Sequence, residues 1–240
     1  MRNLLIFMAF VAIFMFGWRY KGCINGVKGT GPVVQETRPL EPIHGVSVGG
    51  GAEMTIVRSE VSQITIETQQ NVLDRIKTEV RNGILHIALD GFVTNADIRY
   101  RVEMPELSAL NLSGAVQVRV ETPFEGLDAE FSMSGGSSLK TSGMSYRSVN
   151  MEMSGGSQST LSGSAERLDA DLSGGTQLHA FDLMTKQGKV DLSGGALMEC
   201  FPSEALEADI SGGARVEYKG SPSVTQHVSG GGVIIAVDPG

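Results

Sequence analysis

The stretch Asp169-Ala170-Asp171-Leu172-Ser173-Gly174-Gly175-Thr176-Gln177-Leu178-His179-Ala180 contains the pattern from which the fold follows. Apolar and polar residues alternate up to Leu172, and they alternate again from Gln177 onward. Alternation with a period of two is typical of a half-buried strand. The glycines between the two runs reach positive φ without a steric cost, which favours a sharp corner. The stretch therefore predicts two short strands joined by a Ser-Gly-Gly turn.

The Ser-Gly pair recurs along the second half of the chain, with steps of 21, 20, 19, 20, 18 and 18 residues from serine to serine. The copies are Ser113-Gly114, Ser134-Gly135, Ser154-Gly155, Ser173-Gly174, Ser193-Gly194, Ser211-Gly212 and Ser229-Gly230. A period near twenty residues is the signature of a solenoid, in which each repeat stacks on the next.

Aligning the repeats on the serine gives columns of one character. The residue before the serine is always apolar: Leu112, Met133, Met153, Leu172, Leu192, Ile210 and Val228. A second apolar column follows the glycines, with Ser159 as an exception: Val118, Leu139, Leu178, Met198, Val216 and Ile234. Two further columns point outward. One is Asn111, Ser132, Glu152, Asp171, Asp191, Asp209 and His227, and the other is Arg119, Lys140, Thr160, His179, Glu199, Glu217 and Ile235.

These columns predict an all-β fold, a parallel β-helix-like solenoid of coils of about 18–21 residues, stacked about 4.8 Å apart. The alternative is an array of antiparallel hairpins that forms a sandwich or barrel. The single period favours the solenoid, because hairpins would show two alternating spacings. The 31 glycines agree with an all-β chain, and the net charge of −8 argues against a nucleic-acid partner.

Residues 1–23 are predicted to be a signal or anchor segment rather than part of the fold. Arg2 precedes a continuous apolar run, Leu4–Phe16, which is short for a bilayer span of about 20 residues. Gly22-Cys23 resembles the processing site of bacterial lipoproteins, in which the cysteine is acylated. The alternative is an uncleaved N-terminal anchor, with Trp18 and Tyr20 at the membrane interface.

Three segments follow the predicted anchor. Residues 24–42 are rich in Gly and Pro and are predicted to be a linker. Residues 43–105 are predicted to be an irregular N-terminal β cap, with a hairpin at Asn82-Gly83, a helical turn near Val72–Ile76, and a divergent copy of the repeat around Gly49–Gly51. Residues 106–237 form the repeat solenoid, and 43–237 are expected to be one folded unit.

The chain resembles the head GIN domain family of putative auto-transporter adhesins, which are bacterial envelope proteins often exported as lipoproteins. The resemblance spans about residues 30–237 and rests on Thr30–Arg38, Ile43–Val48, Asn71–Val80 and Asn82–Ile87, followed by the Ser-Gly-Gly ladder. It implies stacked β coils and an extracytoplasmic location, in the periplasm or at the cell surface. It brings no catalytic residues, and we assign none.

The acids of one outward column are a candidate cation-binding face. They are Glu152, Asp171, Asp191 and Asp209, with Asp169 two residues from Asp171. Stacked carboxylates repel one another, and a divalent cation such as Ca²⁺ would offset that repulsion. The alternative is a row of solvated charges that keeps the sheet face soluble.

Cys200 falls in an inward column and is interpreted as a core residue. The four histidines are scattered along the chain and are interpreted as surface residues.

The sequence therefore predicts a non-catalytic, membrane-tethered binding or structural module of the bacterial cell envelope. Its expected partners are the membrane, through the N-terminal segment, and a surface glycan or an envelope or host protein. An end-to-end homodimer is a further expectation, because the last coil would leave a sheet edge unpaired. The alternatives are an envelope-stress or signalling accessory domain, and a carbohydrate-active β-helix enzyme that uses the acidic column.

Overall fold

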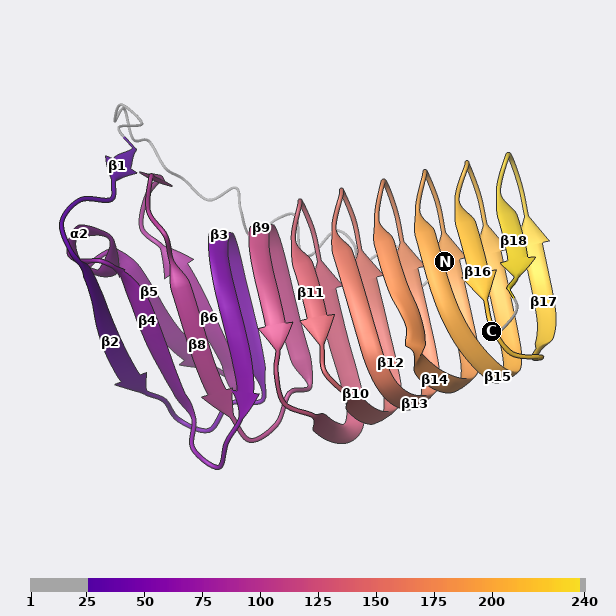
Figure 1. The fold of residues 1–240 in the computed structure, drawn as a ribbon, viewed down its shortest axis with the longest axis horizontal. Helices are drawn as coiled ribbons and strands as arrows, with labels where there is room; N and C mark the ends of the chain where they lie inside the picture. The colour runs from indigo at the N-terminus through magenta and orange to yellow at the C-terminus, as the bar shows by residue number, and fades with distance from the viewer. Residues whose placement is uncertain (1–25, 238–240) are drawn as a thin grey trace.

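In a computed structural model of the chain, residues 26–237 are described, and they form an elongated all-β solenoid (Figure 1). The predicted signal or anchor segment 1–23, with its candidate lipidation residue Cys23, lies outside the described residues. The solenoid strands are β9 (Ala109–Val120), β10 (Phe124–Met133), β11 (Ser138–Thr141), β12 (Met144–Met153), β13 (Gln158–Leu172), β14 (Gln177–Leu192), β15 (Leu197–Ile210), β16 (Arg215–Tyr218), β17 (Ser223–Val228) and β18 (Val233–Ala236).

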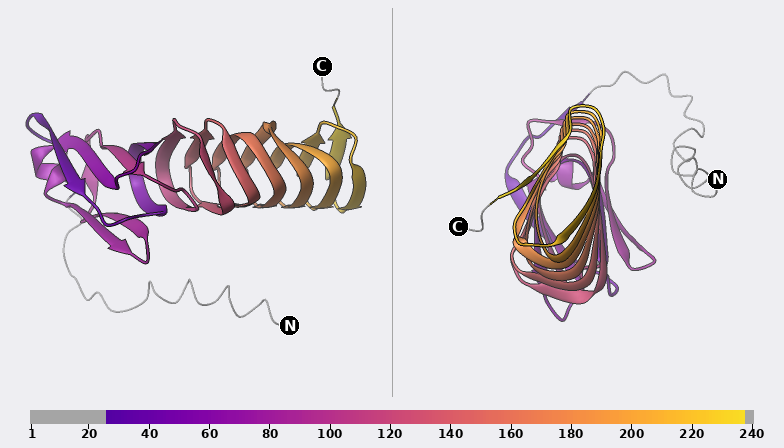
Figure 2. Two further views of the ribbon diagram at one scale, coloured as in Figure 1. Left: turned by 90° about the horizontal axis from the view of Figure 1, so that it is seen from below. Right: turned by 90° about the vertical axis from the view of Figure 1, so that its right-hand side faces the viewer.

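The coils stack in parallel and in the register that the sequence columns predicted. Leu172 pairs with Met153 on one side and with Leu192 on the other. All pairings among β9–β18 are parallel, which confirms the β-solenoid and excludes the hairpin array. Seen from the end, the coils superpose into one flattened ring (Figure 2). The Ser-Gly-Gly corner joins the strands that run along its two long sides.

The glycines of the corner connect each coil to the one before it. The first glycine of each pair has positive φ, as at Gly174 (φ 80°). The amide of the second glycine donates to the carbonyl of the first glycine one coil back, as from Gly175 N to Gly155 O at 2.8 Å. The same bond links Gly195 to Gly174 and Gly213 to Gly194, each at 2.8 Å. The corners therefore form a continuous hydrogen-bonded ladder of their own.

The interior is a narrow column of apolar side chains contributed by both long sides of the ring. Fully buried members include Phe131, Met151, Leu161 and Leu168, each at most 1% exposed. Ser159, the exception in the predicted apolar column, is also buried, and its hydroxyl has no hydrogen-bond partner among the described residues.

The N-terminal cap closes one end of this core. Its elements are β1 (Val27–Lys28), β2 (Val33–Pro39), β3 (Gly45–Arg58), β4 (Gln63–Gln69), α2 (Gln70–Leu73), β5 (Ile76–Arg81), β6 (Ile84–Leu89), β7 (Val93–Thr94) and β8 (Arg99–Met104). The divergent repeat copy is confirmed, because Gly49 and Gly50 of β3 lie beside Ser113 and Gly114 of β9. The stack of coils thus begins at β3, before residue 106, and the chain builds the rest of the cap before it returns at β9.

Antiparallel pairing distinguishes the cap from the solenoid. β2 pairs with β4, β4 with β8, and β5 with β6. The predicted hairpin is present at Asn82 (φ 51°) and Gly83 (φ 74°), as a two-residue turn with both φ values positive. The predicted helical turn is the four-residue α2, which begins two residues earlier than expected.

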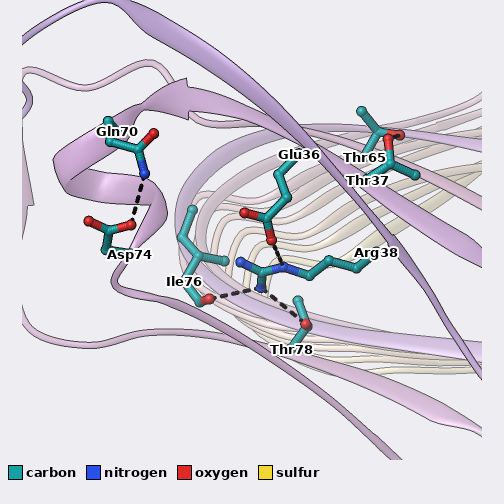
Figure 3. Close-up of polar contacts among 8 residues, drawn as sticks. All are labelled: Glu36, Thr37, Arg38, Thr65, Gln70, Asp74, Ile76 and Thr78. Carbon is teal, nitrogen blue, oxygen red and sulfur yellow. Dashed lines mark hydrogen bonds and ion pairs between the residues drawn. The ribbon is translucent and has the colours of Figure 1, made fainter.

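The prediction of a linker is wrong for residues 33–39, which form β2 and pair with the edge of β4. Its side chains are also tied to the cap (Figure 3). The Arg38 guanidinium donates to Ile76 O at 2.9 Å and to Thr78 Oγ1 at 3.1 Å, and it pairs with Glu36. The physical reason is that β4 would otherwise present an open edge, which a paired strand covers.

At the far end, β17 and β18 pair on one side only, with β15 and β16, within the described part of the chain. Val228 and Val233 there are 40% and 42% exposed. Between residues 26 and 237, no helix combines the length and the apolar character that a membrane span needs.

Candidate functional site

The two long sides of the ring carry different outward side chains. The strands before each Ser-Gly-Gly corner form the acidic side, defined here by Glu152, Asp171, Asp191 and Asp209. The strands after the corner form the groove side, which carries Arg119 and Lys140. Each column is straight because the parallel strands are stacked in register.

On the acidic side, the structure brings together the carboxylates that the sequence predicted. Asp171 is paired in register with Glu152 and Asp191, and Asp191 with Asp209. Neighbouring strands lie about 4.8 Å apart, so like charges sit side by side. None of these four acids forms an ion pair with a described residue, whereas Asp169 is paired with Arg167 at 2.8 Å.

The pKa of the Asp191 carboxyl is raised, first by partial burial and then by the neighbouring charges of Asp209 and Asp171. Lys189 acts in the opposite direction. A shallow hollow of about 190 Å³ lies beside Asp171, Asp191 and Asp209. The described residues contain no cluster of three or more His, Cys, Asp or Glu arranged to hold a metal ion. The acids form a row along the sheet rather than a cage, and Ca²⁺ binding here stays a prediction.

A hollow of about 440 Å³ forms a groove on the other side. It crosses β3, β8, β9, β11, β13 and β14, and so spans the junction of the cap with the first coils. Its polar lining residues are Glu53, Thr55, Arg99, Gln117, Arg119, Ser138, Lys140, Gln158, Thr160 and His179. The apolar lining residues Met54, Tyr100, Val118 and Leu139 are at most 5% exposed, so the groove offers polar groups to a ligand.

Strand register arranges the polar groups of the groove in two rows. In one row, Gln117, Ser138, Gln158 and Gln177 are successive neighbours, and Gln158 Nε2 donates to Gln177 Oε1 at 3.3 Å. In the other row, Thr55, Arg119, Lys140, Thr160 and His179 are successive neighbours. Both rows run across the strands, along the long axis of the solenoid.

Charge is unevenly compensated in the groove. Arg99 Nη1 lies 3.0 Å from Glu67 Oε1, and Arg99 Nε lies 3.4 Å from Glu53 Oε2. The hydrogen bonds to Glu67 and then to Glu53 raise the pKa of Arg99. Arg119 and Lys140 are both exposed, and neither forms an ion pair with any residue in the described range 26–237. The groove therefore holds two adjacent, uncompensated cations.

The other residues considered from sequence do not assemble into a reactive site. His179 Nδ1 lies 2.9 Å from Glu199 Oε2, and His44 Nδ1 lies 2.9 Å from Ser108 Oγ in the cap. Cys200 is buried in the core, and burial raises the pKa of its thiol to about 12. The repeated serines lie one per coil, and Ser134 Oγ donates to the Leu112 carbonyl of the preceding coil at 3.4 Å.

Sequence reasoning placed Arg119 and Lys140 in one outward column but did not single them out. The sequence signal that could have identified them is that no acidic residue stands next to either cation in that column. The contribution of Glu53 and Arg99 from the cap could not be found in this way, because it depends on how β3 and β8 pair.

Comparisons with known proteins agree on one fold. A family profile described as "Putative auto-transporter adhesin, head GIN domain" matches residues 43–222. A putative adhesin from Bacteroides fragilis is similar in structure, with a TM-score of 0.82 and 16% identity over 89% of this chain and 100% of that one.

Two proteins from Parabacteroides distasonis are also similar. One, described as a putative lipid binding protein, has a TM-score of 0.76 and 16% identity, and the other, a putative adhesin, has 0.72 and 21%. Both matches cover 89% of this chain and 100% of the other. At these identities the likeness shows the fold alone. No curated protein matches the sequence.

Proposed function

Because the chain belongs to the family described as putative auto-transporter adhesin, head GIN domain, we propose that it is a non-catalytic binding module of the bacterial cell envelope. The observation that carries this proposal is the groove, which presents two rows of polar side chains on a rigid β scaffold. A row of identical strand spacings suits an extended ligand that makes the same contact at successive coils.

The proposed ligand is a surface glycan, with an envelope or host protein as the alternative. One structural neighbour is described as a putative lipid binding protein. In this chain the groove does not favour an acyl chain, because the apolar residues behind it are buried and its exposed lining is polar.

The tether is part of the proposal. Residues 1–23 would hold the domain at the membrane, either through acylation of Cys23 or as an uncleaved anchor. The extracytoplasmic location is proposed from the same segment, with support from the adhesin description of the family. End-to-end pairing of two copies through β17 and β18 stays a prediction.

The absence of catalysis is proposed from the family and from the acidic side. Acid–base work on a glycosidic bond needs two carboxyls with separated roles and pKa values. Asp171, Asp191 and Asp209 instead stack in register in one row on an open sheet face, so they lie on one side of a bound sugar and do not flank its glycosidic bond; the raised pKa of Asp191 does not by itself supply such a pair.

The test is retention of the full chain, in mild nonionic detergent, on immobilised bacterial and host polysaccharides and on envelope proteins. The flow-through is assayed for new sugar ends. Saturable retention without cleavage supports the proposal. Cleavage that Asp171→Asn with Asp191→Asn abolishes, in a chain that remains folded, overturns it in favour of an enzyme. No retention on any polysaccharide or protein overturns the binding function.

A further inference from the structure

We infer that the groove binds an acidic polysaccharide, one whose sugars carry carboxylate or sulfate groups, laid along the solenoid axis over Arg119 and Lys140. The inference rests on the proposed binding function and names the ligand class for the same groove. Four observations support it: the two cations without an ion-pair partner, the row of neutral hydrogen-bonding side chains beside them, the burial of the apolar lining residues, and the pairing of the groove strands on both edges.

The first observation is electrostatic. The chain carries a net charge of −8, so acids are available to neutralise surface cations. Arg101, Arg147 and Lys186 each have such a partner. Arg119 and Lys140 do not, although they are in-register neighbours at a strand spacing of about 4.8 Å, where like charges repel. An anionic ligand that lies across both strands would neutralise the pair.

The second observation is the row of neutral donors and acceptors. Gln117 and Ser138 lie on β9 and β11, two residues before Arg119 and Lys140, and Gln158 lies beside Ser138 on the next strand, β13. Amide and hydroxyl groups both donate and accept, as sugar hydroxyls do. A polymer in the groove would therefore meet cations along one edge and neutral hydrogen-bonding groups along the other.

The third observation favours a sugar over a lipid tail as the ligand. Met54, Tyr100, Val118 and Leu139 lie behind the groove and are at most 5% exposed, so the surface that a ligand meets is polar. No lining aromatic is exposed, since Tyr100 is buried. The groove would hold a sugar through charge and hydrogen bonds rather than through stacking on a ring.

The fourth observation separates a glycan from an acidic protein segment. Extended peptides commonly bind by adding a strand to an open sheet edge. The groove strands have no open edge, because β9 is paired with β3 and β11, and β11 with β9 and β13. A peptide laid here would leave its backbone groups without strand partners, whereas a glycan has no such requirement.

The experiment measures binding of the full chain, in mild nonionic detergent, to three immobilised polymers. Alginate is the acidic polysaccharide, polyglutamate the acidic polypeptide, and dextran the neutral polysaccharide. The test variant is Arg119→Gln with Lys140→Gln. The matched control is Lys77→Gln with Lys186→Gln, which removes the same charge from exposed sites that do not line the groove. Circular dichroism checks that both variants are folded.

The expected result is saturable binding to alginate that exceeds binding to polyglutamate and dextran. The groove variant lowers alginate affinity by roughly tenfold or more, and the control by less than about twofold. The difference shrinks as salt rises from 0.05 to 0.5 M, because exposed charges are screened.

Four results would overturn the inference. Equal effects of the two variants would place alginate outside the groove. Binding of polyglutamate as tight as that of alginate would favour an acidic protein. Dextran binding equal to alginate binding, or no binding to any of the three, would reject the acidic glycan and leave the proposed function to be decided by the wider panel of polysaccharides and proteins.

Discussion

Gly174→Ala tests whether the Ser-Gly-Gly corners hold the coils together. Gly174 has φ 80°, and a Cβ built on it lies 2.8 Å from Gly155 O and 3.2 Å from Gly155 N in the preceding coil. Both atoms are backbone, so neither can move aside as a flexible side chain would. The matched control is Gly175→Ala, one residue later, where φ is not in the positive region and the nearest atom, Gly155 O, is 3.7 Å away.

Two effects add up in Gly174→Ala. Placing an L-residue other than glycine in the left-handed region costs about 1–2 kcal/mol. Pushing the coils apart also weakens the hydrogen bond from Gly175 N to Gly155 O, now 2.8 Å, which contributes about 0.5–1.5 kcal/mol. The sum is about 1.5–3.5 kcal/mol, which for a chain of this size corresponds to a fall of roughly 3–14 °C in the midpoint of thermal unfolding. Gly175→Ala should stay within about 1 kcal/mol of the parent.

The assay is thermal and urea unfolding of the full chain, followed by circular dichroism with identical detergent in every sample. If Gly174→Ala unfolds at the same temperature as Gly175→Ala, the corner ladder does not contribute as argued. A uniform loss in both variants would point to glycine flexibility in general rather than to the contact with Gly155.

Three further predictions concern the core and the acidic side. Leu168→Ala should lower the free energy of unfolding in urea by about 2–5 kcal/mol, because Leu168 is 1% exposed. The control Leu127→Ala, at a residue 67% exposed, should change it by less than about 0.5 kcal/mol. Equal losses in the two variants would contradict the core assignment. In a Cys23→Ser background, Cys200 should resist maleimide until the chain is unfolded, because burial raises its pKa to about 12; rapid labelling of the folded chain would refute this. The raised pKa of Asp191 means that the folded state holds this proton more tightly than the unfolded state does, so this carboxylate destabilises the fold above its folded pKa. Asp191→Asn should therefore be more stable than the parent at pH 7, by less than about 1 kcal/mol because the group is exposed. This difference in stability should vanish below about pH 4, where the carboxyl is protonated in both states. A variant that is less stable than the parent at pH 7 would show that the charge stabilises the fold.

The solenoid could be predicted from sequence because its determinants are local and repeated. Each copy alternates with a period of two, and each corner needs glycine in the same place, so the columns at Leu172 and Asp171 fixed both the coil and the register. Even the divergent copy at Gly49–Gly51 kept this signal.

The cap and the groove were harder because their contacts are specific to single places in the chain. β2 is rich in polar residues and ends at Pro39, and its pairing depends on the edge of β4 and on Arg38 reaching Ile76 and Thr78. The groove depends on a cap strand, β8, lying beside β3, which no repeat column encodes. The acidic side was found because its charges form a column, whereas the two cations of the groove occur in only two coils.

The most direct test of the groove as the binding surface is the rate at which single lysines react with an amine-reactive ester, measured by mass spectrometry with and without saturating alginate. Lys140 lines the groove, while Lys77 and Lys186 do not. We expect alginate to slow labelling of Lys140 several-fold and to leave Lys77 and Lys186 unchanged. Saturable binding that leaves Lys140 as reactive as before, or that protects all three lysines equally, would contradict the assignment of the groove as the ligand site.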